Sequence, residues 1–138
     1  MSTPTVVFPD VERLVVDYLA AALEQAGEQV TVGVGVPDGW DRRRSPAHVS
    51  VACDGMPWMR HPVIGRASVR VTVRARSTSE AKRLAEVAQG LLLAHPSGGG
   101  VAGVRPHSGV MPTRDPDTRA DLAWFAVGVT VRTQDMAT

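Results

Sequence analysis

The fold is decided by two adjacent stretches, RASVRVTVRAR at residues 66–76 and STSEAKRLAEVAQGLLLA at residues 77–94. In the first stretch, valines alternate with arginine and threonine, which is the period of a strand with one buried face and one charged face. In the second, leucines and alanines recur three and four positions apart, which predicts an amphipathic helix over residues 78–94. Ser77 and Glu80 form a capping box at its start. A long strand that runs directly into a helix therefore lies at the centre of the predicted fold.

The flanking sequence predicts the remaining helix and strands. Apolar residues at helical spacing place a helix over residues 11–26, with Asp10 as its N-cap and Gly27 as the residue that ends it. Strands are expected where apolar residues alternate with polar residues or glycine. These strands cover residues 29–36, 48–53 and 121–133, and residues 101–111 add a short edge strand interrupted by proline.

Segments rich in glycine, proline and charge are expected to connect these elements as irregular loops at residues 37–46, 54–65, 97–103 and 112–119. Most of the strands have one apolar face, which suits an antiparallel sheet that leaves its other face to solvent. We therefore predict an α+β fold, a two-layer sandwich in which two helices cover one face of a mainly antiparallel sheet. With 138 residues and no internal repeat, the chain is expected to form a single domain, residues 1–138.

Composition narrows the functional class. The formal net charge of +1, from 15 basic and 14 acidic residues, is too balanced to indicate a dedicated binder of nucleic acid or of anionic membranes. No stretch approaches the roughly 18 apolar residues that cross a bilayer, and residues 1–9 lack the pattern of a signal peptide. We therefore expect a cytosolic protein that makes no contact with a membrane.

The residues that carry catalytic chemistry are scattered along the sequence. The histidines lie in different loops and strand ends, so no metal site is predicted. The single cysteine, Cys53, occupies an apolar position of a predicted strand, which favours a small core hydrophobe over a nucleophile paired with a histidine. The sequence also lacks a phosphate-binding loop, a dinucleotide fingerprint and a Gly-x-Ser-x-Gly motif. It predicts neither an enzyme nor a cofactor.

Two sets of side chains favour binding instead. Residues 55–79 contain no acidic residue but several arginines, so one face or edge of the sheet is locally basic. This face suits contact with an acidic protein surface or with passing nucleic acid, and a solvated face that discourages aggregation is the alternative. Large apolar residues in predicted loops form the second set; they suit a protein interface, unless they fold back onto the core. The arginines are Arg60, Arg66, Arg70, Arg74 and Arg76, extended by Arg42, Arg43 and Arg44, and the apolar residues are Trp40, Met56, Trp58 and Met59.

The order of elements resembles that of the tail terminator proteins of long-tailed phages with flexible, non-contractile tails. The resemblance covers nearly the whole chain and rests on four places in the pattern. These are the helix opening at PDVE (residues 9–12), the strand ending near VP (36–37), the arginine-bearing strand that enters STSEA (77–81), and the final strand at WFAV (124–127). It implies a small structural virion protein whose copies form a six-membered ring on the head-proximal end of the tail tube.

Such a ring halts polymerisation of the tube and offers a docking surface to the head connector. The implied partners are further copies of the chain, the tail tube protein and the connector protein, with DNA passing through the ring without specific binding. The implied location is the virion tail, after assembly in the host cytoplasm. A head completion or head–tail joining protein is the closest alternative, and a small hydrolytic or ligand-binding domain that uses Cys53 and a histidine is a third.

A closed ring requires heterologous contacts, in which one edge of a subunit meets a different surface of its neighbour. The arginine-bearing strand and the two tryptophan loops are our candidates for these surfaces. A channel that lets DNA slide should avoid strong attraction to phosphates. The arginine face is therefore expected at subunit contacts and not in the lumen.

Overall fold

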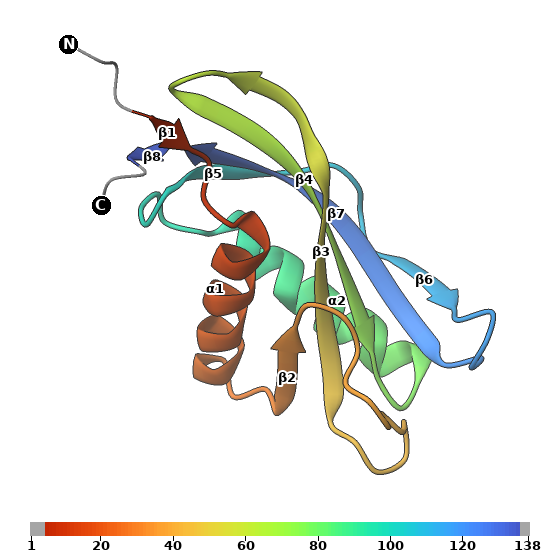
Figure 1. Cartoon of the computed structure of the whole chain (residues 1–138). Coiled ribbons are helices and arrows are strands. Elements are labelled where there is room, and N and C mark those ends of the chain that lie inside the picture. Colours follow the sequence, from red (N-terminus) through yellow and green to blue (C-terminus); the bar gives the residue numbers. More distant parts are fainter. Residues whose placement is uncertain (1–4, 136–138) are drawn as a thin grey trace.

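The arginine-bearing strand lies at the centre of a curled sheet in the computed structural model, which describes residues 5–135 (Figure 1). In chain order the elements are β1 (Val6–Val7), α1 (Val11–Gln25), β2 (Val30–Gly33), β3 (Ala47–Arg60), β4 (Ile64–Arg74), α2 (Thr78–Leu93), β5 (Val101–Pro106), β6 (Met111–Arg114), β7 (Asp121–Arg132) and β8 (Gln134–Asp135). The main sheet has the order β2-β3-β4-β7-β5, and β6 pairs with β7 beside β5. Strands β1 and β8 form a separate antiparallel pair.

Strand β4 pairs on both sides along its length. Its register with β7 runs without a shift from Ile64 opposite Arg132 to Arg74 opposite Leu122, and β3 covers its other edge. All pairs in the sheet are antiparallel except that of β2 with β3, which is parallel. The predicted mainly antiparallel sheet is therefore confirmed.

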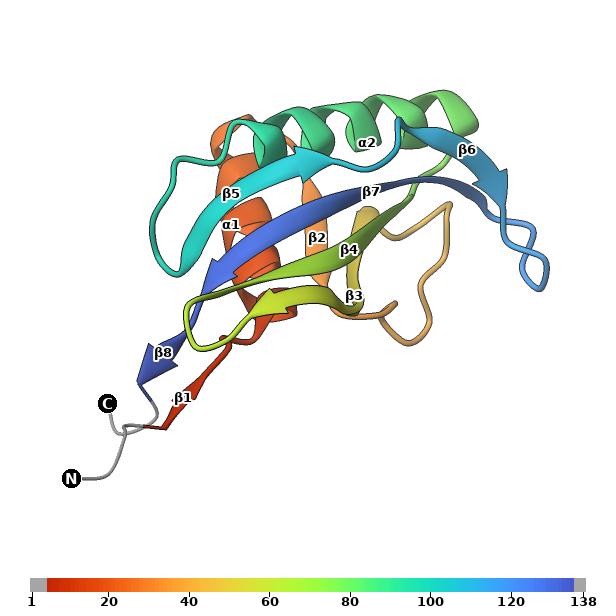
Figure 2. The same ribbon diagram turned by 90° about the horizontal axis from the view of Figure 1, so that it is seen from above.

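Both helices pack on one face of this sheet, as Figure 2 shows from above. The alternation in β4 and β7 directs one set of side chains into the layer between sheet and helices, where Val71 and Phe125 are fully buried. Leucines from α1 and α2, such as Leu19 and Leu84, close this core from the other side. The predicted α+β two-layer architecture is confirmed.

The predicted helix starts are confirmed by their caps. The side chain of Asp10 accepts a hydrogen bond from the backbone N–H of Arg13, and that of Ser77 accepts one from Glu80. Each bond satisfies an N–H group that the first turn of a helix leaves without a partner. Gly27 follows α1 with φ of +81°, the left-handed conformation expected of a residue that ends a helix.

Several boundaries differ from the sequence prediction. The edge strand predicted over residues 101–111 ends at Pro106, and it begins at Val101, within the predicted loop 97–103. The strand predicted over residues 29–36 ends at Gly33, because Gly35 takes φ of +84° and turns the chain away; Val34 and Val36 are exposed. The predicted loop at 112–119 begins with β6, an edge strand that tolerates Pro112 because it pairs on one side only.

The largest difference lies at residues 54–65, where an irregular connection was predicted. Strand β3 continues to Arg60 and forms a long hairpin with β4, shown at the top of Figure 1. The register shifts on either side of Gly55, and Pro57 lies within the second shift, where no ladder hydrogen bond is required of it. These shifts break the alternation that would otherwise predict a strand.

The base of this hairpin packs tightly around Gly65. A β-carbon at this position would overlap the sulfur of Met56 and lie 2.8 Å from the ring of Phe8, in the segment that leads into α1. Both side chains are half-buried and pack against the core. Because Gly65 has no side chain, Met56 and Phe8 can pack closely against it, and this packing holds the hairpin to the N-terminal segment.

Gly65→Ala is expected to lower the free energy of unfolding by about 1–3 kcal/mol, the usual cost of forcing extra volume into a packed site. Denaturant unfolding measures this cost. Gly109→Ala is the matched control, because a β-carbon there meets nothing within 4 Å. Equal stability of the two variants would contradict this packing.

Candidate functional site

The structure distributes the predicted interface residues over three places. The hairpin tip, residues 58–63, lies at one end of the sheet, the uncovered face of the sheet lies in the middle, and the loop of residues 37–46 lies at the other end (Figure 1). Met56, Trp58, Met59 and Arg66 belong to the hairpin, Arg70 and Arg74 to the uncovered face, and Trp40, Arg42, Arg43, Arg44 and Arg76 to the loop end. They do not form one surface.

The hairpin tip carries the densest group of exposed apolar side chains. Trp58, Met59 and Val63 are 43%, 52% and 56% exposed. The guanidinium carbon of Arg66 lies 5.1 Å from the centre of a Trp58 ring, a cation–π contact that fixes the ring on the hairpin. Met56 differs from its neighbours, since it is half-buried and packs against the core.

The uncovered face of the sheet forms a groove of about 710 Å³. Its floor includes Thr72, Trp124 and Ala126, and Val34 and Val36 form one wall. This wall belongs to the chain that leaves β2 and crosses the sheet on the side away from the helices. The groove therefore combines a partly apolar floor with the arginines of β4.

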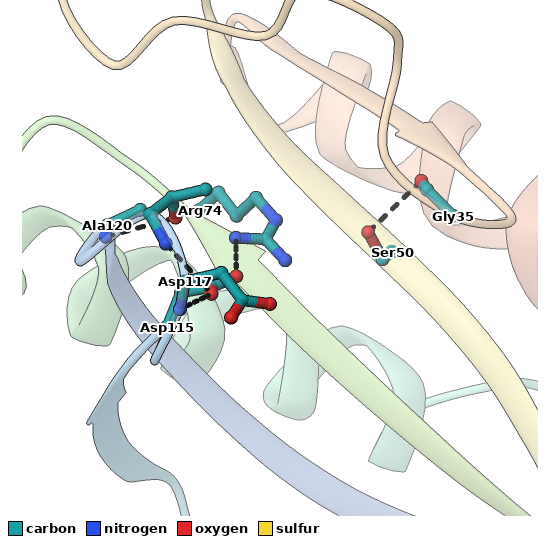
Figure 3. A network of polar contacts seen from close by, with 7 residues as sticks. Gly35, Ser50, Arg74, Asp115, Asp117 and Ala120 are labelled. Atoms are coloured by element: carbon teal, nitrogen blue, oxygen red, sulfur yellow. Dashed lines mark hydrogen bonds and ion pairs between the residues drawn. The ribbon is translucent and has the colours of Figure 1, made fainter.

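Two arginines of this face have carboxylate partners of different exposure. Arg70 lies 3.4 Å from Asp54, and both side chains are about half exposed, at 51% and 46%. Arg74 donates to Asp115 at 3.2 Å, and these side chains are only 16% and 18% exposed (Figure 3). Arg70 is available to a partner, whereas Arg74 serves the fold.

Asp115 organises the turn between β6 and β7. Its carboxylate accepts hydrogen bonds from the backbone N–H groups of Asp117 and Thr118 as well as from Arg74. The pKa of this carboxyl is held below its ordinary value chiefly by those two N–H groups, and further by the Arg74 guanidinium. Arg74 therefore ties the turn to the central strand across a large sequence separation.

Arg74→Glu is expected to lower the melting temperature by several degrees, because it places a second carboxylate against Asp115. Arg70→Glu at the exposed position is expected to change it little. Thermal unfolding of both variants at pH 7 measures the difference. The opposite order of melting temperatures would show that Asp115 does not depend on Arg74.

His48 is a polar residue of this region that the sequence analysis did not single out. It is 3% exposed; its Nε2 lies 2.7 Å from the carbonyl oxygen of Gly35, and its Nδ1 lies 2.6 Å from the hydroxyl of Thr31. A carbonyl only accepts, so Nε2 carries the proton and Nδ1 accepts from Thr31. The hydroxyl of Ser50 donates to the same carbonyl (Figure 3). His48 and Ser50 together hold the crossing chain against the sheet.

Burial lowers the pKa of His48, and the charge of Arg74 adds to this effect against the opposing effect of the Gly35 carbonyl. The folded state therefore holds His48 neutral at a pH where the unfolded chain already binds a proton. The free energy of unfolding then falls as the pH drops below about 6.5, the ordinary value for histidine, towards the lowered pKa.

His48→Gln keeps an N–H donor near Gly35 and removes the titrating group. We expect the loss of unfolding free energy between pH 7.5 and pH 5 to be smaller in His48→Gln than in the wild type. Denaturant titrations at both pH values measure this loss. Because both proteins contain the other histidines, the difference between their losses reports on His48. Equal losses would contradict the lowered pKa.

The loop of residues 37–46 is held by local hydrogen bonds. The indole N–H of Trp40 donates to the carbonyl of Pro46, and the hydroxyl of Ser45 accepts from the N–H of Asp41. The Asp41 carboxylate accepts from the N–H of Arg43 at 2.8 Å. Trp40 is half-buried by this arrangement and closes the loop on itself.

Cys53 is half-buried, packs against the core, and points its thiol towards the carbonyl oxygen of Gly55 at 3.7 Å. Within residues 5–135, no group of three or more histidine, cysteine or acidic side chains is placed to hold a metal ion. None of the helices described in this range is long and apolar enough to span a membrane.

Neither a family model nor a curated protein matches the chain. The likeness to tail terminator proteins therefore rests on the sequence pattern alone.

Proposed function

We propose that the protein is a structural virion component that caps the head-proximal end of a phage tail tube as a ring of copies. In this role it stops polymerisation of the tube and offers a docking surface to the head connector. The observation that carries the proposal is the hairpin tip, an apolar projection at one end of the sheet, whereas arginines gather at the other end.

Exposed groups of large apolar side chains on a folded protein mark contact surfaces, because water is excluded from them when a partner binds. Trp58, Met59 and Val63 form such a group. The opposite end of the sheet is basic, with Arg42 and Arg43 on a hydrogen-bonded loop. Two unlike ends are what a heterologous contact needs, and heterologous contacts that close by rotation form rings.

The uncovered sheet face supports the same role. It leaves the exposed pair of Arg70 and Asp54 beside a groove with an apolar floor, a mixture common at protein interfaces. We assign this face to contacts between subunits or with the tube. The channel for DNA is assigned elsewhere, since a row of arginines would retard a sliding duplex.

Light scattering over a concentration series, with negative-stain images at its top, tests the proposal. We expect particles near six times the subunit mass of 14.7 kDa, with a central hole, in solution or on purified tail tubes. A chain that stays monomeric under both conditions would refute the proposal. Retention on filled heads and not on tails would assign the protein to the head completion class.

Trp58→Ala is expected to abolish or weaken ring formation while lowering the free energy of unfolding by less than about 1 kcal/mol, because Trp58 is 43% exposed. Its ring contacts the hairpin residue Arg66 by a cation–π interaction that is itself worth about 0.5–1 kcal/mol. Mass measurements and denaturant unfolding of the same sample separate the two effects. Leu93→Ala, at a 39% exposed apolar position on α2, is the matched control. Normal rings with Trp58→Ala would remove the hairpin tip from the interface.

A further inference from the structure

Three arginines converge at the loop end of the sheet. Arg42 and Arg43 come from the loop of residues 37–46, and Arg76 follows the end of β4. Together they line a hollow of about 330 Å³ to which no other described residue contributes. We refer to these three residues as the arginine triad.

The guanidinium groups of the triad have no protein partner. Among residues 5–135, none of them takes part in an ion pair or a side-chain hydrogen bond. Arginines elsewhere do find carboxylates, as Arg83 does with Glu28 through two hydrogen bonds of 2.8 and 3.1 Å. The triad therefore gathers three positive charges, none of which is paired with a carboxylate of the described residues.

The loop holds two members of the triad in place. Asp41 accepts the N–H of Arg43 with its carboxylate and the N–H groups of Arg44 and Ser45 with its carbonyl. Asp41 is thus used to shape the turn. Arg42 and Arg43 extend from this hydrogen-bonded turn, and they line one hollow together with Arg76.

We propose that the arginine triad binds a phosphate group. Three planar guanidinium groups offer several N–H donors around one hollow, and each pairs best with two oxygens at once. A phosphate supplies up to two negative charges and three free oxygens, whereas a carboxylate supplies one charge and two oxygens. A phosphate therefore matches three arginines more fully than a carboxylate does.

The surroundings leave space for a molecule attached to that phosphate. A larger hollow of about 810 Å³ shares Arg42 and Arg43 with the triad. Trp40, Val36 and Pro37 line it as well, and so do the acidic residues Asp38, Asp41 and Asp115. A small phosphate monoester presents this chemistry in full, whereas a nucleic-acid backbone presents one charge and two free oxygens at each of its successive phosphodiesters. The triad shares Arg42 and Arg43 with the basic end used in the ring proposal, but phosphate binding requires neither the hairpin tip nor Arg70.

The test is a titration of the full chain with inorganic phosphate at low ionic strength, followed by calorimetry or by chemical shifts of the loop amides. We expect saturable binding that weakens about tenfold in Arg43→Ala and in Arg76→Ala, since each loses one charge-assisted pair. Arg105→Ala, at an exposed position on β5, is the matched control and is expected to bind like the wild type. Unsaturable binding, or triad variants that bind as the wild type does, would overturn the proposal.

Three further ligands identify the source of the phosphate. Affinity for a nucleoside monophosphate equal to or above that for inorganic phosphate, without added affinity for DNA, points to a small ester. Tighter binding of a short DNA duplex points to a nucleic-acid backbone. In that case the slope of log affinity against log salt concentration should fall by about one for each arginine removed. Equal affinity for a glutamate oligomer and for phosphate would overturn the assignment to phosphate.

Discussion

The structure depends on the pairing of β4 with both of its neighbours along one unbroken register. A strand in this position has no free edge, so only its two faces remain for contact with the rest of the chain. Because side chains alternate between these faces, Val69, Val71 and Val73 lie under the helices. This burial orients the sheet relative to both helices. Strands β3 and β7 extend as far as β4 does because each hydrogen-bonded residue of β4 requires a partner on each side.

The same constraint explains why the two ends of the molecule are chemically different. Towards one end, β3 and β4 continue into the hairpin, where Trp58 and Met59 leave the protection of the helices and meet solvent. Towards the other end, β4 stops at Arg74 and the chain turns into α2, so loops and arginines gather there. One long strand pair thus carries an apolar end and a basic end.

The elements that could be predicted are those whose signals lie within a few neighbouring residues. Both helices, their caps at Asp10 and Ser77, and the strands β4 and β7 follow from patterns within a few residues. The extension of β3 to Arg60 could not be predicted, because Gly55 and Pro57 are turn signals that register shifts absorb only when β4 is alongside. The contacts within the candidate site could not be predicted either, because they join residues far apart in the sequence. Nothing near Arg74 in the sequence indicates Asp115 as its partner, 41 residues away, and nothing near His48 indicates Gly35 as the group it holds.

The parallel pairing of β2 with β3 has a consequence for how the surface can vary. Because β3 starts at the same end as β2, residues 34–46 must travel back along the sheet, and they do so across the face without helices. Lengthening such a connection costs little, about 0.6 kcal/mol for each doubling. Insertions in this segment would enlarge the wall of the groove and leave the hydrogen bonds between the strands of the sheet unchanged. The fold therefore separates the part that must keep its length from a part that is free to diverge and meet a different partner.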